Sequence, residues 1–147
     1  MRLAIATTLS VLLGAVCSVP GLAQPVPIEL GRNFSLRPGE SAPMRGEELR
    51  VGFEGVKNDS RCPKGEQCVW AGDATVWVWL QRGSGPRGMH ELHAAEGPGQ
   101  TLQVFGHDLR LVGLAPGPVT GKAIAKGDYV LTLRLSQSSA SESDPSR

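Results

Sequence analysis

The sequence lacks any run of charge of one sign. Its 147 residues include 15 Lys or Arg and 14 Asp or Glu, which are interspersed along the chain and leave a formal net charge of +1. Proteins that bind nucleic acid or anionic membranes concentrate positive charge on one face or one segment. We therefore expect no nucleic-acid partner, and a membrane surface is not expected to be a main partner either.

Motifs that mark common catalytic and cofactor sites are also missing. The chain has no Gly-x-Ser-x-Gly elbow, no Gly-rich phosphate loop ahead of a helix and no carboxylate-rich calcium loop. It shows neither an internal repeat nor a long helical periodicity. On this basis we expect a non-catalytic protein that carries no cofactor.

The N-terminus has the pattern of a secretory signal peptide over residues 1–23. After a short basic start, an apolar run extends from Leu3 to Val16, and the small residues Gly21 and Ala23 precede the expected cleavage site. That run is too short to be a permanent membrane anchor. We expect the mature chain to begin at Gln24, in the periplasm or outside the cell, without a transmembrane segment.

Cys17 offers an alternative to cleavage near Ala23. The residues from Leu13 to Cys17 form a degenerate lipobox, in which a lipid would be attached to the cysteine. Val16 departs from this pattern, because the residue before a lipidated cysteine is normally small. The alternative localisation is therefore a lipid-anchored protein.

Export also decides how the cysteines are interpreted. Cys17 belongs to the leader, so Cys62 and Cys68 remain as a pair in an oxidising compartment, where a disulfide is the default. The seven-residue ring that they close would stabilise the fold by about 2 kcal/mol, by restricting the unfolded chain. A redox site is the alternative, although the spacing is not Cys-x-x-Cys and no βαβ pattern surrounds it.

Residues 24–135 are predicted to form a single all-β domain. Apolar residues recur with a period of two in about seven short segments that Gly- and Pro-rich turns separate. These segments are 26–30, 34–36, 49–53, 74–80, 102–104, 109–111 and 129–135. The pattern predicts an antiparallel sandwich or a partly open barrel. Residues 136–147 are rich in serine and are predicted to be a disordered tail.

Two details of this pattern are less regular. The alternation slips at Gly55-Val56, which predicts a β-bulge in the strand that begins at Leu49. Residues 88–96 contain good helix formers, but glycine and proline confine them to a short segment. They are compatible with either two helical turns or a strand that continues the preceding hairpin.

The three histidines of the chain supply a candidate metal site. His90-Glu91-Leu92-His93 resembles the zinc-hydrolase pattern His-Glu-x-x-His, but its second histidine stands one residue early. His107 is the remaining histidine and would have to provide a third ligand. The favoured alternative is that His90 and His93 lie on an exposed loop or edge strand and bind no metal.

The tryptophans are the strongest indication of binding. Trp77 and Trp79 share one face of the strand predicted over 74–80. If exposed, they would form a flat platform for a sugar ring or for the apolar patch of a protein. The alternative is that a loop covers this face. Trp70 is expected to pack on the disulfide or to close one end of the core.

The segment around the cysteines resembles a family signature. Asp59-Ser60-Arg61-Cys62-Pro63, followed by Cys68-x-Trp70-x-Gly72, is similar to a group of small exported bacterial proteins and lipoproteins of uncharacterised function. The similarity extends to residues 49–56 and 127–133, and so covers most of the domain. It implies a bacterial periplasmic or extracellular setting and brings no activity with it. Asp59 itself is expected to form an Asx-type turn or to pair with Arg61.

Three functional hypotheses follow from these residues. The first is a binding or structural module that contacts a protein, small-molecule or carbohydrate partner through Trp77 and Trp79 or through the loop with Asp59, Arg61 and Trp70. The second is a metal-binding or redox enzyme that uses His90, His93 and His107 or the cysteine pair. The third is a proteinase-inhibitor-like domain that presents the ring from Pro63 to Gln67, because a disulfide preorganises such a loop for binding.

Overall fold

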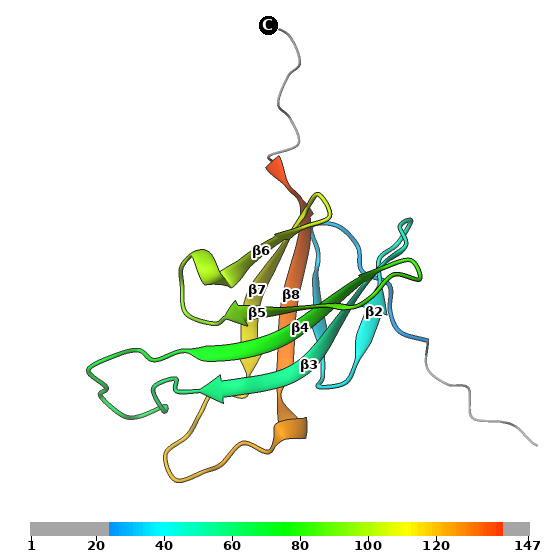
Figure 1. Cartoon of the computed structure of the whole chain (residues 1–147). Coiled ribbons are helices and arrows are strands. Elements are labelled where there is room, and N and C mark those ends of the chain that lie inside the picture. Colours follow the sequence, from blue (N-terminus) through cyan, green and yellow to red (C-terminus); the bar gives the residue numbers. More distant parts are fainter. Residues whose placement is uncertain (1–23, 140–147) are drawn as a thin grey trace, which may run out of the picture.

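Two four-stranded antiparallel sheets face each other across one apolar core in the computed structural model (Figure 1). The structure describes residues 24–139. The expected signal peptide, Cys17 and the last eight residues of the predicted tail therefore lie outside the described residues. The predicted all-β fold with antiparallel sheets is confirmed.

Each sheet combines strands from distant parts of the chain. The first has the order β1 (Asn33–Leu36), β8 (Val130–Gln137), β7 (His107–Ala115), β6 (Thr101–Val104). The second has the order β2 (Ser41–Pro43), β3 (Leu49–Asp59), β4 (Ala74–Arg82), β5 (Gly88–His93). Two short 3-10 helices, η1 (Pro98–Gln100) and η2 (Lys126–Asp128), complete the described elements. None of the helices in this part of the chain has the length and apolarity needed to cross a membrane.

The core is built from the apolar positions that alternate along the longer strands. Successive side chains of a strand point to opposite faces, so a period-two pattern places all of its apolar members on one side of the sheet. These members are fully buried between the two sheets: Val51, Phe53, Val76, Val78, Leu80, Leu92, Leu109, Leu111, Leu131, Leu133 and Leu135. The sequence pattern therefore identifies the inner faces of β3, β4, β7 and β8.

The strands differ from the predicted segments in several places, among them β2, which none of those segments covers. Residues 26–30 form no strand, and only Ile28 is buried and makes an isolated bridge to Met44. Residues 88–93 adopt the strand alternative, as β5. At the C-terminal end, β8 continues to Gln137, two residues into the segment predicted to be disordered. The predicted bulge in β3 is confirmed, because its pairing with β4 shifts between Phe53 and Gly55.

The outer face of β4 is covered at one of its two tryptophans. The Trp79 indole lies over Gly52 of β3, and the guanidinium of Arg87 stands 4.1 Å from the centre of its ring. Trp79 is only 5% exposed as a result. Glycine is required at position 52, because a Cβ there would come within 2.0 Å of Trp79 Cε2.

This packing predicts that Gly52→Ala destabilises the protein. The added methyl group would force the indole off the sheet, and overpacking of this kind costs about 1–3 kcal/mol. Gly113→Ala in β7 is the matched control, because a Cβ at that strand position meets no atom within 4 Å. Urea unfolding measures both variants. An equal free energy of unfolding for the two would contradict the proposed contact between Gly52 and Trp79.

Candidate functional site

A charged pair marks the point where β3 ends. Arg61 Nε donates to Asp59 Oδ1 at 2.8 Å, and Arg61 Nη2 donates to Asp59 Oδ2 at 2.7 Å. Asp59 Oδ1 also accepts the backbone N–H of Arg61 at 3.3 Å, which closes an Asx-type turn. Both side chains are largely buried, with 10% of Asp59 and 17% of Arg61 exposed. Both expected roles of Asp59, the turn and the ion pair, are present.

The same pair connects the two sheets. Arg61 Nη1 donates to the carbonyl of Leu114 at 2.7 Å, and Nη2 donates to that of Pro116 at 2.9 Å, at the end of β7. Tyr129, directly before β8, donates its hydroxyl to Asp59 Oδ2 at 3.1 Å. One ion pair at the end of β3 is thus hydrogen-bonded to β7 and to the start of β8. The surface expected at Asp59 and Arg61 is therefore mostly an internal contact between sheets.

The network shifts the ionisation of its members. Hydrogen bonding from Arg61 outweighs burial and holds the pKa of Asp59 below its usual range. Hydrogen bonding to Asp59 in turn raises the pKa of Arg61. Burial and then the nearby Asp59 carboxylate raise the pKa of Tyr129. All three shifts keep the carboxylate charged and the phenol neutral at neutral pH.

The lowered pKa of Asp59 predicts how stability depends on pH. A carboxyl group whose pKa falls on folding stabilises the fold above its unfolded pKa of about 3.9, and this contribution is lost as the pH drops through the folded pKa. Asp59→Asn should therefore cost about 1.5–3 kcal/mol at pH 7, the range for hydrogen bonds to charged groups. The difference from wild type should shrink below about pH 4. Urea unfolding at pH 3, 5 and 7 measures it.

Asp128→Asn is the control for this experiment, because Asp128 is exposed in η2. Its free energy of unfolding should follow that of the wild type at every pH. A cost of Asp59→Asn that stays constant from pH 3 to pH 7 would mean that the carboxylate charge is not what stabilises the network.

The loop of residues 60–73, which we name the ring loop, connects β3 to β4 and is closed at its base. Ser60 N–H donates to the carbonyl of Asp73 at 2.7 Å, and Cys62 N–H donates to that of Ala71 at 2.9 Å. Gly72 has a φ of +72°, and a Cβ there would lie 1.8 Å from the carbonyl oxygen of Ser60. Only glycine therefore allows the two ends of the loop to approach this closely.

The predicted disulfide joins Cys62 to Cys68 within the ring loop, with 5.9 Å between the two Cα atoms. The far side of the ring contacts the loop between β7 and β8. Lys64 N–H donates to the carbonyl of Pro118 at 2.9 Å, and the hydroxyl of Thr120 donates to Glu66 Oε1 at 2.6 Å. Both loops project from the same end of the sandwich (Figure 1). The ring is thus held by its own base, by the disulfide and by a neighbouring loop.

The end of the ring loop presents apolar side chains to solvent. Val69 is 92% exposed and Trp70 is 81% exposed, and Val119 on the adjoining loop is 42% exposed. The expectation that Trp70 packs on the disulfide or closes the core is therefore wrong. The sequence did not reveal this exposure, because a tryptophan beside a disulfide can equally turn inward.

The expected platform of two tryptophans is incomplete. Trp79 is covered by Arg87, whereas Trp77 remains 40% exposed. The indole N–H of Trp77 donates to Glu91 Oε1 at 2.9 Å, and Lys57 Nζ lies 5.4 Å from the centre of its ring. Of the two side chains, only Trp77 offers an aromatic surface, and its polar edge is already occupied.

The three histidines do not meet at one site. His90 lies opposite Val78 and His93 opposite Thr75, so the two side chains point to opposite faces of β5. His107 belongs to the other sheet, where its Nδ1 stands 3.0 Å from the carbonyl of Phe105. Within residues 24–139, no three His, Cys, Asp or Glu side chains are grouped so that they could hold a metal ion. The arrangement that the metal hypothesis requires is absent there.

His93 instead has a local structural contact. Its Nδ1 lies 2.6 Å from Asp73 Oδ2, and Asp73 Oδ1 accepts the backbone N–H of Ala95 at 2.8 Å. Burial acts to raise the pKa of Asp73, but these hydrogen bonds outweigh it and hold the pKa below its usual range. The pair fastens the end of β5 to the end of the ring loop.

Comparison with protein-family models, with curated proteins and with solved structures found no match to this chain. The similarity to the Asp-Ser-Arg-Cys-Pro group stays a prediction. The candidate site is therefore defined by the geometry of this chain alone. It is a braced loop of residues 60–73 with an exposed valine and tryptophan at its end.

Proposed function

We propose that this protein is an exported, non-catalytic binding module of the periplasm or extracellular space, and that the ring loop carries its binding surface. The partner is a protein with an apolar pocket that receives Trp70. The observation that supports this most directly is the 81% exposure of Trp70 on a loop that is otherwise firmly held. The disulfide supports the oxidising compartment, since such bonds persist mainly outside the cytosol.

An exposed tryptophan of this kind suits a protein interface. Tryptophan is enriched among the few residues that dominate binding energy, because it buries a large area and fixes only two torsion angles. Val69 adjoins it in sequence and is 92% exposed. Together they form an apolar end on a mostly polar loop, which is typical of the centre of an interface surrounded by a polar rim.

The loop is also organised before binding. The disulfide, the base hydrogen bonds and the contact of Lys64 with Pro118 leave little freedom to lose when a partner binds. A binding loop that is rigid in advance gains affinity because the entropic cost of ordering it has been removed. The Asp59–Arg61 network serves the same purpose, since it orients the loop relative to both sheets.

The charge around the loop favours a protein over a lipid surface. Lys64 and Glu66 of the ring carry opposite charges, and Glu66 is hydrogen-bonded to Thr120. Membrane-binding loops and helices typically surround their apolar residues with several cations that contact anionic headgroups. The ring loop contains two cations, Arg61 and Lys64, and Arg61 is buried in its ion pair.

The other two hypotheses have less support. The carbonyl oxygens of Pro63 and Glu66 lie 3.7 and 3.6 Å from Cys62 Sγ, and carbonyl groups do not stabilise the thiolate that redox chemistry needs. A proteinase inhibitor would use the same ring. It differs from our proposal only in its partner, which would be a protease bound through residues 63–67 rather than through Trp70.

A crosslinking experiment tests the proposal. The full-length chain carries a photoreactive amino acid at position 69, whose native side chain is exposed, and is irradiated in its native host. We expect a discrete covalent adduct with one protein, and we expect the adduct to be lost when Trp70→Ala is added. The purified partner should then bind the Trp70→Ala variant about 30-fold more weakly, since a hot-spot residue contributes 2 kcal/mol or more.

Trp77→Ala is the matched control, because it removes the other partly exposed tryptophan and leaves the ring loop intact. It should retain the crosslink and the affinity. An adduct that persists without Trp70, or binding to lipid vesicles that depends on Trp70, would contradict a protein partner at this surface. Inhibition of a secreted protease that survives Trp70→Ala would instead favour the inhibitor hypothesis.

Removal of the disulfide tests whether the rigidity of the ring loop contributes to binding in a protein that is still folded. The variant with both Cys62→Ala and Cys68→Ala should lose only about 2 kcal/mol of stability, because the closed loop is short. It should remain folded, since the core between the sheets is independent of the ring. The measurements are urea unfolding and partner affinity, and we expect about a tenfold loss of affinity from the greater freedom of the loop. Unchanged affinity would show that the disulfide does not preorganise the surface.

A further inference from the structure

A groove lies between β1 and β2, each the outermost strand of its sheet on this side. Within the described sheets, β1 pairs only with β8 and β2 only with β3, and the short turn of residues 37–40 carries the chain from one sheet to the other. The groove between them has a volume of about 770 Å³, which falls within the usual range of small-molecule sites. In Figure 1 the ring loop projects to the left and β2 lies to the right, so the groove is remote from the ring loop.

The N-terminal arm, residues 24–30, forms one wall of this groove and is held in place at Ile28. Ile28 N–H donates to the carbonyl of Pro43 at 2.7 Å, and Arg45 N–H donates to that of Ile28 at 2.9 Å. Ile28 is itself 1% exposed and belongs to the core. This wall of the groove is therefore fixed around Ile28 before any ligand enters.

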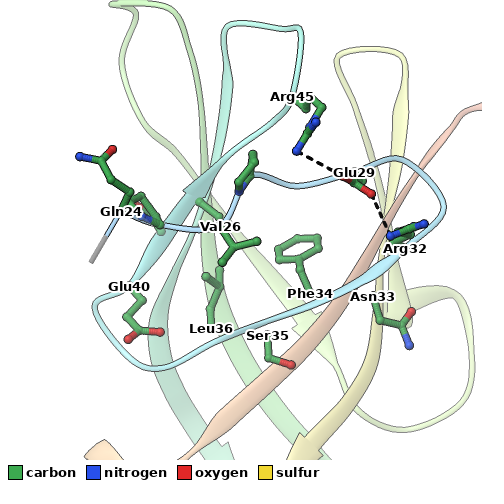
Figure 2. Close-up of a pocket in the computed structure, with 14 residues that line it drawn as sticks. Gln24, Val26, Glu29, Arg32, Asn33, Phe34, Ser35, Leu36, Glu40 and Arg45 are labelled. Atoms are coloured by element: carbon green, nitrogen blue, oxygen red, sulfur yellow. Dashed lines mark ion pairs between the residues drawn. The ribbon is translucent and has the colours of Figure 1, made fainter. Parts of the chain in front are cut away.

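The middle of the groove is apolar. Figure 2 shows the side chains of Val26, Phe34 and Leu36 close together, from the arm and from β1. Val26 is 81% exposed although the arm that carries it is held by the core. An apolar side chain that is exposed on a fixed wall, opposite an aromatic ring, can cover the body of an aliphatic molecule.

One end of the groove carries an excess of positive charge. Glu29 is 3.1 Å from Arg32 and 3.4 Å from Arg45, so two guanidinium groups share a single carboxylate (Figure 2). Both arginine side chains are mostly exposed, at 78% and 67%, and retain donors that Glu29 does not occupy. The planar fork of these donors matches the geometry of a carboxylate.

The other end carries the opposite charge. Glu40 lies across the apolar residues from the arginines in Figure 2, and its Oε2 accepts the backbone N–H of Arg37 at 2.8 Å. The Glu40 carboxylate would repel an anionic group of a ligand at this end of the groove. A molecule with one anionic group is thereby oriented, with its anion toward Arg32 and Arg45 and its apolar part toward Val26 and Phe34.

We propose that this groove binds an amphipathic small molecule with an aliphatic body and a single carboxylate, such as a medium-chain fatty acid. The aliphatic chain lies along Val26 and Phe34, above the buried Leu36, and the carboxylate is hydrogen-bonded by Arg32 and Arg45. This site is separate from the ring loop, and the protein can use both at once.

Titration of the purified protein with three ten-carbon probes tests the site. The probes are decanoate, decanol and decyltrimethylammonium, and binding is followed by amide chemical shifts in two-dimensional NMR. We expect decanoate to perturb residues 24–45, to saturate below the concentration at which it self-associates, and to bind about tenfold more tightly than decanol. The cationic probe should bind more weakly than decanol, because the arginines repel it.

Substitutions test which residues bind the carboxylate and which contact the aliphatic chain. The Arg32→Gln and Arg45→Gln double variant should bind decanoate about tenfold more weakly and lose its preference over decanol. Val26→Asp should weaken both decanoate and decanol, and it should not affect folding because Val26 is exposed. Arg110→Gln is the control; this arginine is on β7, is not a lining residue of the groove and should leave binding unchanged.

Three results would overturn the proposal: no saturable binding of decanoate, equal affinity for decanoate and decanol, or shift changes that leave residues 24–45 unaffected. Trp70→Ala distinguishes this site from the ring loop. It should leave decanoate binding intact. A negative result for decanoate therefore does not bear on the proposed protein partner of the ring loop, and a missing protein partner does not bear on decanoate binding.

Discussion

The ion pair between Asp59 and Arg61 is the interaction on which the rest of the structure depends. It lies where β3 ends, and its remaining hydrogen bonds reach Leu114 of β7, Pro116 just after β7 and Tyr129 just before β8. A largely buried ion pair stabilises a fold only when its donors and acceptors are satisfied, because both charges have left water. Here Arg61 donates to two carboxylate oxygens and two carbonyls, so the pair meets that condition. The two sheets are joined at this end by polar contacts and elsewhere by the apolar core.

The same pair determines where the exposed tryptophan lies. Arg61 immediately precedes Cys62, so the side chain that contacts β7 also sets the direction in which the ring loop leaves β3. Gly72 permits the loop to close against Ser60, and Thr120 supports it from the neighbouring loop. The charged side chains of Asp59 and Arg61 are turned inward and hold the loop, whereas the apolar Val69 and Trp70 are turned outward. This is the reverse of the usual distribution of polar and apolar side chains, and it is the observation on which the proposed binding surface rests.

On the outer faces of the sheets, the sequence pattern predicts the face to which a side chain points but not whether that side chain is exposed. The period-two alternation places Trp77 and Trp79 correctly on the outer face of β4, and it places His90 and His93 on opposite faces of β5. It does not reveal that Gly52 leaves room for the Trp79 indole or that Arg87 covers it. Exposure is decided by what stands opposite a side chain, and the residue opposite comes from another strand. The groove between β1 and β2 has the same origin, because it exists only where edges of two sheets and the N-terminal arm come together.

The sequence by itself determined the all-β class, the inner faces of the long strands, the bulge in β3, the Cys62–Cys68 disulfide and the pairing of Asp59 with Arg61. The disulfide was expected because the N-terminal segment indicates export, and the others follow from residues that are close in the chain, since side-chain alternation and turn geometry are local properties. Only the tertiary structure decided the contact of Asp59 with Tyr129, the exposure of Trp70, the burial of Trp79 and the separation of the three histidines. Asp59 and Tyr129 are 70 positions apart, and nothing in either local segment specifies that β3 and β8 meet. Contacts of that kind arise when whole sheets pack together, and many different local sequence patterns are compatible with the same packing.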